Sequence, residues 1–195
     1  MSTSKIEAWL RPDSLEEALS ILALKRDDVA PLGGSTSIAR MAGIQRRFMM
    51  DLRGVGLNTI EIGDGDAGAG FALIGASASL TALGRHEALN AAFCGVFARM
   101  ADTAASEPLR NMITAGGNAF QAFTWSELPP ILLALNASFE FARKEGRRAL
   151  GADDFYQGHP RTKRRPDELL TGIRVPLGDP KVEVLYDRFS LARND

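Results

Sequence analysis

The sequence predicts an α+β fold. Segments with helical spacing of apolar residues and short strand-like apolar runs both occur, without a repeat period and without strict βαβ alternation. The 19 glycines gather at the boundaries between these segments, where loops are expected. A chain of 195 residues that is 45% hydrophobic and 24% charged is long enough for one packed domain, or for two small subdomains that share a core.

The first expected element is a helix that begins after Ser14. Ser14 and Glu17 form an S-x-x-E capping box, and apolar residues follow at helical spacing at Leu15, Ala18, Leu19 and Leu22. A short apolar run at residues 29–32 then leads into Gly33-Gly34. The three residues after this pair are good N-cap types, which predicts a short helix over residues 38–42.

Further elements are expected along the rest of the chain. A loop rich in glycine and aspartate at residues 64–70 joins two strands of a hairpin. An apolar helical face over residues 88–101 includes Cys94 as a small core residue. The Pro129-Pro130 pair fits the first turn of a helix that reaches Leu135. Strand signals occur at residues 48–52, 59–62, 71–74, 138–142, 172–175 and 182–185.

Composition excludes several classes of protein. Cys94 is the only cysteine, which excludes a disulfide within the chain, Cys-ligated zinc and a protein-bound iron–sulfur cluster. A net charge of −1 gives no global electrostatic case for nucleic-acid binding. No apolar run approaches the ~18 residues of a membrane span, and residues 1–10 lack the apolar core of a secretory signal. We therefore expect a cytoplasmic protein.

Two glycine-rich segments carry the candidate chemistry: Leu32-Gly33-Gly34-Ser35-Thr36-Ser37 and Thr114-Ala115-Gly116-Gly117-Asn118. Paired glycines favour turns with positive φ and let a ligand approach the backbone closely. Successive N–H groups in such a turn, followed by a helix, suit a phosphate or diphosphate. Neither segment matches the P-loop or the Rossmann pattern, and either one alone is also typical of an ordinary turn. The residues thus predict a cofactor with a diphosphate without naming it.

Six motifs follow one another in an order that resembles a known family. They are Leu15-Glu16-Glu17-Ala18; Pro31-Leu32-Gly33-Gly34-Ser35-Thr36; Ile74-Gly75-Ala76; Leu109-Arg110-Asn111-Met112-Ile113-Thr114-Ala115-Gly116-Gly117-Asn118; Leu128-Pro129-Pro130 with Leu132-Leu133-Ala134-Leu135; and Asp167-Glu168-Leu169-Leu170-Thr171. The chain resembles the FAD-binding subunit or domain of molybdenum hydroxylases, such as xanthine dehydrogenase, carbon monoxide dehydrogenase and aldehyde oxidoreductase. The fourth motif, similar to the family's IRN-x-x-T-x-GGN, is the most specific of the six.

The resemblance implies a flavin-binding module with two subdomains, residues 1–55 and 56–190, and FAD between them. Residues 191–195 would begin a further C-terminal domain that this chain lacks. The residues expected to contact FAD are Leu32, Gly33, Gly34, Ser35, Thr36, Ser37, Ile38, Ala104, Ala105, Thr114, Gly117, Asn118, Glu127, Leu170 and Arg188. Two of them depart from the family pattern, because Glu127 stands where Asp is usual and Arg188 where Lys is frequent.

The function implied is that of an FAD-binding electron-transfer subunit of a molybdenum-dependent hydroxylase. Electrons would pass from a molybdenum cofactor on a large subunit, through two [2Fe–2S] clusters on a small subunit, to FAD and then to an external acceptor. The flavin performs the redox chemistry, so no catalytic residue and no metal ligand is expected on this chain. The alternatives are a cofactor-free interaction module of such a complex and a stand-alone flavoprotein oxidase.

Three other features have more than one interpretation. Residues 143–165 contain eight basic and three acidic residues, which favours a solvated loop and hairpin. A docking patch for an acidic partner subunit is the second interpretation, and nucleic-acid binding is the third, because few aromatic residues lie among the basic ones. Trp125 is expected to have a packing role, with stacking near a flavin as the alternative. His86 and His159 are expected to be surface polar residues rather than ligands.

Overall fold

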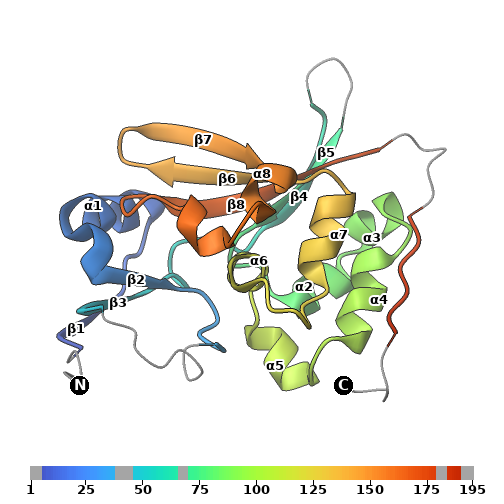
Figure 1. The fold of residues 1–195 in the computed structure, drawn as a ribbon, viewed down its shortest axis with the longest axis horizontal. Coiled ribbons are helices and arrows are strands. Elements are labelled where there is room, and N and C mark those ends of the chain that lie inside the picture. The colour runs from blue at the N-terminus through green and yellow to red at the C-terminus, as the bar shows by residue number, and fades with distance from the viewer. Residues whose placement is uncertain (1–5, 38–45, 66–69, 179–183, 190–195) are drawn as a thin grey trace.

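The computed structural model describes residues 6–37, 46–65, 70–178 and 184–189, and it confirms the α+β class (Figure 1). Within these residues the strands form a three-stranded sheet with the order β1-β3-β2 and a five-stranded sheet with the order β4-β5-β8-β6-β7. The smaller sheet lies at one end of the molecule, and the larger sheet extends from it over a group of helices (Figure 1).

The smaller sheet is parallel. Its elements in chain order are β1 (Ala8–Leu10), α1 (Leu15–Lys25), the 3₁₀ turn η1 (Arg26–Asp28), β2 (Val29–Leu32) and β3 (Phe48–Asp51). The capping box begins α1 as predicted, because the Glu17 N–H donates to Ser14 Oγ at 3.1 Å. The Glu17 carboxylate accepts from the Asp13 N–H at 2.9 Å. Leu32, the last residue of β2, lies opposite Asp51 and leads into the first glycine segment.

The larger sheet is antiparallel. Its strands are β4 (Ile60–Gly63), β5 (Phe71–Gly75), β6 (Ser138–Arg143), β7 (Gly146–Gly151) and β8 (Leu169–Pro176). The predicted hairpin around residues 64–70 is the β4–β5 pair, and β6–β7 forms a second hairpin. Central strand β8 pairs with both hairpins, and its buried first residues, Leu169 and Leu170, face the region between the two sheets.

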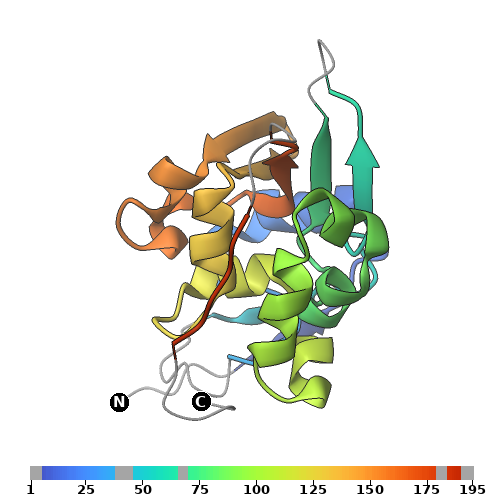
Figure 2. The ribbon, with the colours of Figure 1, turned by 90° about the vertical axis from the view of Figure 1, so that its right-hand side faces the viewer.

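Most helices lie on one side of the larger sheet (Figure 1). They are α2 (Leu80–Arg85), α3 (Glu87–Ala92), α4 (Val96–Thr103), α5 (Glu107–Met112), α6 (Ala115–Gln121) and α7 (Leu128–Ala134), while α8 (Ala152–Tyr156) and the 3₁₀ turn η4 (Pro160–Lys163) follow β7. Figure 2 shows residues 184–189 running along α4 and α7. The Arg99 guanidinium of α4 donates to the Val184 carbonyl at 3.4 Å.

The two sheets share part of their apolar core. Leu22 of α1 and Met50 of β3 belong to one buried cluster with Ala142 of β6 and Leu169 of β8. Burial of these side chains against each other holds the smaller sheet beside the larger one. The division into subdomains at residues 1–55 and 56–190 stays a prediction, and residues 191–195 lie outside the described part.

Three expected elements need comment. The helical face over residues 88–101 is interrupted by a turn at which Cys94 and Gly95 have φ values of 52° and 72°, so the prediction of one helix is wrong. Cys94 is exposed in that turn and is not a core residue. The Asn90 side chain stabilises the turn, since its Oδ1 accepts from the Ala98 N–H at 2.7 Å. The predicted strand at 182–185 is wrong at Val184 and Leu185, which pair with no strand in the described part of the chain. Residues 182 and 183, like the predicted helix at 38–42, lie outside the described residues.

Candidate cofactor-binding site

A cavity of about 910 Å³ opens between the two sheets and α6. This volume suits a large organic ligand. The predicted site residues, apart from Ile38, which lies outside the described part, all line it: Leu32, Gly33, Gly34, Ser35, Thr36, Ser37, Ala104, Ala105, Thr114, Gly117, Asn118, Glu127, Leu170 and Arg188. Residues that are far apart in the sequence thus line the same cavity.

The glycines of the first segment allow a close approach between the two segments. A Cβ atom on Gly34 would lie 1.4 Å from the Met112 carbonyl oxygen, and one on Gly33 would lie 2.6 Å from Thr114 Oγ1. The expected positive φ angles do not occur at Gly33, Gly34, Gly116 or Gly117, and Ser35 has a φ of 59° instead. The conformational prediction is therefore wrong, and glycine is needed here for close packing, of Gly34 on the Met112 backbone and of Gly33 on the Thr114 side chain.

The second segment is the first turn of α6. Thr114 is the N-cap, and its Oγ1 accepts from the Gly117 N–H at 3.2 Å. The Ala115 and Gly116 N–H groups donate to the carbonyls of Ala78 and Ala76 at 2.8 and 2.9 Å. The expected nest of free N–H groups is therefore wrong for this segment, because protein acceptors satisfy the first N–H groups of the helix.

Asn118 supplies the unsatisfied polar group of this segment. Its Oδ1 is buried and has no hydrogen-bond partner among the described residues. The residue lines the cavity one turn into α6. A buried amide oxygen without a donor is costly, so this atom fits a hydroxyl or N–H group of a ligand.

One end of the cavity is closed by a polar cluster around Glu127. Glu127 Oε1 lies 2.8 Å from Arg188 Nη1 and forms an ion pair with it. The angles at these two atoms do not meet the requirements of a hydrogen bond. Glu127 Oε2 accepts from the Thr103 hydroxyl at 2.9 Å and from the Tyr186 hydroxyl, and Arg188 Nη1 also donates to the Thr103 carbonyl at 2.7 Å. Burial, and then the hydrogen bond to Glu127, raises the pKa of Tyr186 to about 12.

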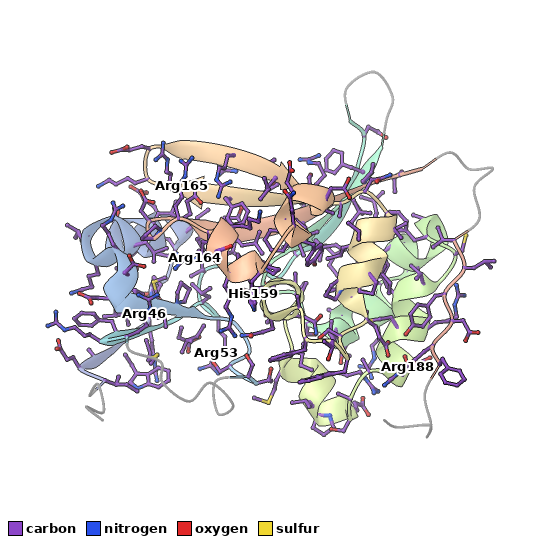
Figure 3. All side chains as sticks on the ribbon, viewed as in Figure 1. Arg46, Arg53, His159, Arg164, Arg165 and Arg188 are labelled. Atoms are coloured by element: carbon purple, nitrogen blue, oxygen red, sulfur yellow. The ribbon has the colours of Figure 1, made fainter. Side chains whose placement is uncertain are left out.

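Two members of this cluster, Thr103 and Tyr186, were not predicted from the sequence. Thr103 ends α4 and Tyr186 lies in the segment that passes along it, and no spacing pattern links either residue to Glu127. Arg188 and Glu127 were expected to contact a cofactor separately, and the structure pairs them with each other. In Figure 3 Arg188 lies at the end of the molecule away from the smaller sheet.

The opposite end of the cavity is cationic. Arg46, Arg161 and Arg164 line it. Figure 3 places Arg46 and Arg164 on the side of the molecule that carries the smaller sheet. Two of these arginines belong to the basic segment 143–165, whose interpretation as a solvated hairpin holds for the β6–β7 turn but is wrong for Arg164, which is half-buried beside the cavity.

The aromatic and histidine candidates have local roles. Trp125 has the predicted packing role, since its ring stacks on that of Phe123 with centroids 4.6 Å apart; it lines the cavity, and 60% of its surface is exposed. His86 and His159 each accept a hydrogen bond from a backbone N–H at the start of a helical turn: His86 from Leu89, and His159 from Arg161.

Among the described residues no group of His, Cys, Asp and Glu side chains could hold a metal ion. In the same part of the chain no helix is long and apolar enough to cross a membrane.

A two-sheet α+β chain with a large cavity between glycine segments is a module for a large organic cofactor. The model of the family described as "FAD binding domain in molybdopterin dehydrogenase" matches residues 3–178. The chain therefore belongs to the family of FAD-binding domains in molybdopterin dehydrogenases, which are oxidoreductases. The resemblance inferred from the six motifs is confirmed.

Individual relatives agree with this family. The chain is 32% identical over 172 residues to the carbon monoxide dehydrogenase medium chain of Afipia carboxidovorans, covering 86% of this chain and 57% of that protein. It is 26% identical over 191 residues to the caffeine dehydrogenase subunit beta of Pseudomonas sp., covering 96% of this chain and 63% of that protein. The chain thus spans about three fifths of the length of these relatives.

Solved structures share the fold. A chain of reconstituted CO dehydrogenase from Oligotropha carboxidovorans superposes with a TM-score of 0.79 at 28% identity, covering 92% of this chain and 62% of that one. A chain of quinoline 2-oxidoreductase from Pseudomonas putida 86 gives a TM-score of 0.85 at 23% identity, covering 100% of this chain and 66% of that one. The second likeness concerns the fold alone.

Proposed function

We propose that the chain binds FAD in the cavity between its two sheets and transfers electrons as the flavoprotein component of a molybdenum-containing hydroxylase. The observation that carries the proposal is the convergence of the described family-matched residues on one cavity, together with the unpartnered Asn118 amide oxygen inside it. Family membership makes FAD the ligand to test first.

The residues around the cavity suit the parts of such a cofactor. Gly33 and Gly34 present backbone without a Cβ, and the hydroxyls of Thr36 and Ser37 add donors for a diphosphate. Asn118 Oδ1 would accept a hydrogen bond from a hydroxyl of the cofactor. Leu170 supplies an apolar wall for the flavin ring. When bound, FAD supplies the electron-accepting and electron-donating chemistry, while these residues bind and orient it and exclude water.

The proposed partners follow from the division of labour in the family. A large subunit would hold the molybdenum cofactor and a small subunit the [2Fe–2S] clusters, with electrons leaving FAD for an external acceptor. A chain with one cysteine cannot ligate such a cluster by itself, which agrees with clusters on a separate subunit. We propose that this complex acts in the cytoplasm.

The rival proposal is a cofactor-free interaction module. One observation favours it, since the first N–H groups of α6 are already satisfied by Ala76, Ala78 and Thr114. A titration of the purified chain with FAD, followed by flavin fluorescence, separates the two. Saturable binding of one FAD per chain, with weaker binding of FMN, is the expected result. An absence of saturable FAD binding by a folded chain would favour the interaction module.

A further inference from the structure

Arg164 is a half-buried cation in the wall of the cavity. Its Nη1 atom donates to the carbonyls of Arg165, Pro166 and Glu168 at 3.0, 3.2 and 2.7 Å. These acceptors fix the side chain but carry no net charge. Burial, and to a smaller extent the charge of Arg46, lowers the pKa of Arg164, which means that its surroundings disfavour the charge it carries.

The carboxylates closest to Arg164 are already paired with other arginines. Asp27 pairs with Arg46 at 3.4 Å, and Asp167 lies 3.9 Å from Arg26. Glu168 holds Arg148 through two hydrogen bonds of 2.8 and 2.7 Å. Among the described residues no carboxylate lies within ion-pair distance of Arg164 itself. A partly desolvated guanidinium without a counter-ion is unfavourable, so the site favours an anion from outside the chain.

Glu168 sets the position of the Arg164 loop. The Glu168 side chain is almost completely buried, and it also accepts the Arg165 N–H at 3.0 Å. Burial by itself would raise the pKa of Glu168, but the hydrogen bonds from Arg148 and the Arg165 N–H outweigh it and hold this pKa below its usual range. The carboxylate therefore stays charged near neutral pH and keeps the loop in place, so that Arg164 is preorganised toward the cavity.

Arg46 completes the site from the other sheet. It precedes β3, lines the same cavity as Arg164, and its charge acts on Arg164. Figure 3 places both arginines on the side of the smaller sheet and Arg188 at the opposite end. Guanidinium groups from two elements that face one cavity suit the oxygens of a phosphate, which they bind with charge-assisted hydrogen bonds.

We propose that Arg164, assisted by Arg46, binds a phosphate group of the dinucleotide, so that the adenylate half of the cofactor occupies this end of the cavity and the flavin occupies the end near Glu127. This inference rests on the proposed function for the identity of the ligand. It adds to the cavity an anion-binding residue that neither glycine segment contains.

The test compares Arg164→Met with Arg165→Met in the full chain. Arg165 is the matched control, because it is adjacent and cationic but does not line the cavity. Its side chain is 54% exposed and approaches Glu168 only at 3.6 Å, a contact that adds little to the two hydrogen bonds from Arg148. Calorimetric titrations with FAD, ADP, riboflavin and inorganic phosphate measure the dissociation constants, and thermal melts without ligand report folding. We expect Arg164→Met to weaken FAD and ADP about tenfold or more and to leave riboflavin within about twofold. Arg165→Met should leave all four ligands within about twofold of wild type.

The outcomes separate this inference from the proposed function. Wild-type affinity of Arg164→Met for FAD and ADP overturns the inference while leaving FAD binding intact. Phosphate binding that depends on Arg164 but persists when FAD is bound also overturns it, because the anion is then not part of the cofactor. If the wild-type chain binds ADP through Arg164 but no FAD, the proposed function fails and the phosphate site remains. Should Arg164→Met not fold, Arg46→Met on the facing wall is expected to give the same loss, and wild-type affinity in it contradicts the proposal.

Discussion

The Glu127 carboxylate and the Arg188 guanidinium form an ion pair of 2.8 Å at one end of the cavity. Glu127 precedes α7, whereas Arg188 lies in the segment 184–189 that runs past α4 (Figure 2). The pair therefore ties the last described segment of the chain to the helices that surround the cavity. Both side chains are mostly buried, so the interaction is only weakly screened by solvent.

Replacement of Arg188 by Met should release this segment. The substitution removes the ion pair and the bond to the Thr103 carbonyl, and it leaves Glu127 buried without its cation. We expect the free energy of unfolding to fall by about 1–3 kcal/mol and amide exchange at residues 184–189 to accelerate. Hydrogen exchange followed by mass spectrometry measures this effect. Asp187→Asn, at an exposed neighbour, is the control and should change neither quantity.

The raised pKa of Tyr186 predicts a loss of stability at alkaline pH. Its pKa is about 12 in the folded chain, against an ordinary value of 10.0 in the unfolded chain. Between these pH values Tyr186 loses its hydroxyl proton in the unfolded state but keeps it in the folded state. The contribution of Tyr186 to the free energy of unfolding is therefore fully present below pH 10 and is lost as the pH rises toward 12. Chemical denaturation at several pH values should show a smaller decline in Tyr186→Phe than in wild type. An identical decline in both proteins would show that Tyr186 is not responsible.

Gly34→Ala should separate the two glycine segments. The added Cβ would lie 1.4 Å from the Met112 carbonyl oxygen, a contact that only a backbone shift can relieve. We expect a loss of about 1–3 kcal/mol or more in the free energy of unfolding, together with weaker FAD binding. Gly151→Ala is the matched control, since its added Cβ would meet no atom of the described residues within 4 Å. Equal melting temperatures for the two variants would contradict the packing explanation.

Gly117→Val should abolish the retention of FAD. Gly117 is exposed to the cavity, and a branched side chain there would occupy space proposed for the cofactor and would press on Thr114 Oγ1, 2.8 Å from the added Cβ. FAD content after gel filtration measures the effect, and the circular dichroism spectrum checks that the variant folds. A folded variant that holds FAD as tightly as wild type would show that the cofactor is placed wrongly.

Much of the fold was predictable because its signals are local. The capping box of α1, the β4–β5 hairpin and the strand signal at residues 172–175, which lies inside β8, each follow from residues a few positions apart. The turn at Cys94 was not predictable, because it depends on a hydrogen bond across the turn from the Ala98 N–H to the Asn90 side chain. A helical pattern of apolar residues persists through that interruption and conceals it.

The sequence predicted that the two glycine segments lie together, but not how their backbone groups are bonded, and their contact with FAD stays a prediction. The motifs located Gly34 and Gly117 correctly on one cavity, but the acceptors of the α6 N–H groups lie on Ala76 and Ala78, far back in the chain. The pairing of Glu127 with Arg188 likewise joins distant segments. Such contacts are set by tertiary packing, which a single sequence does not reveal through spacing.

An absorption spectrum of the purified chain, with identification of any cofactor released on denaturation, tests whether this chain is a flavoprotein. We expect flavin absorption bands and one FAD per chain, either as isolated or after incubation with FAD. A folded, colourless chain that takes up no added FAD would show that it is not a flavoprotein.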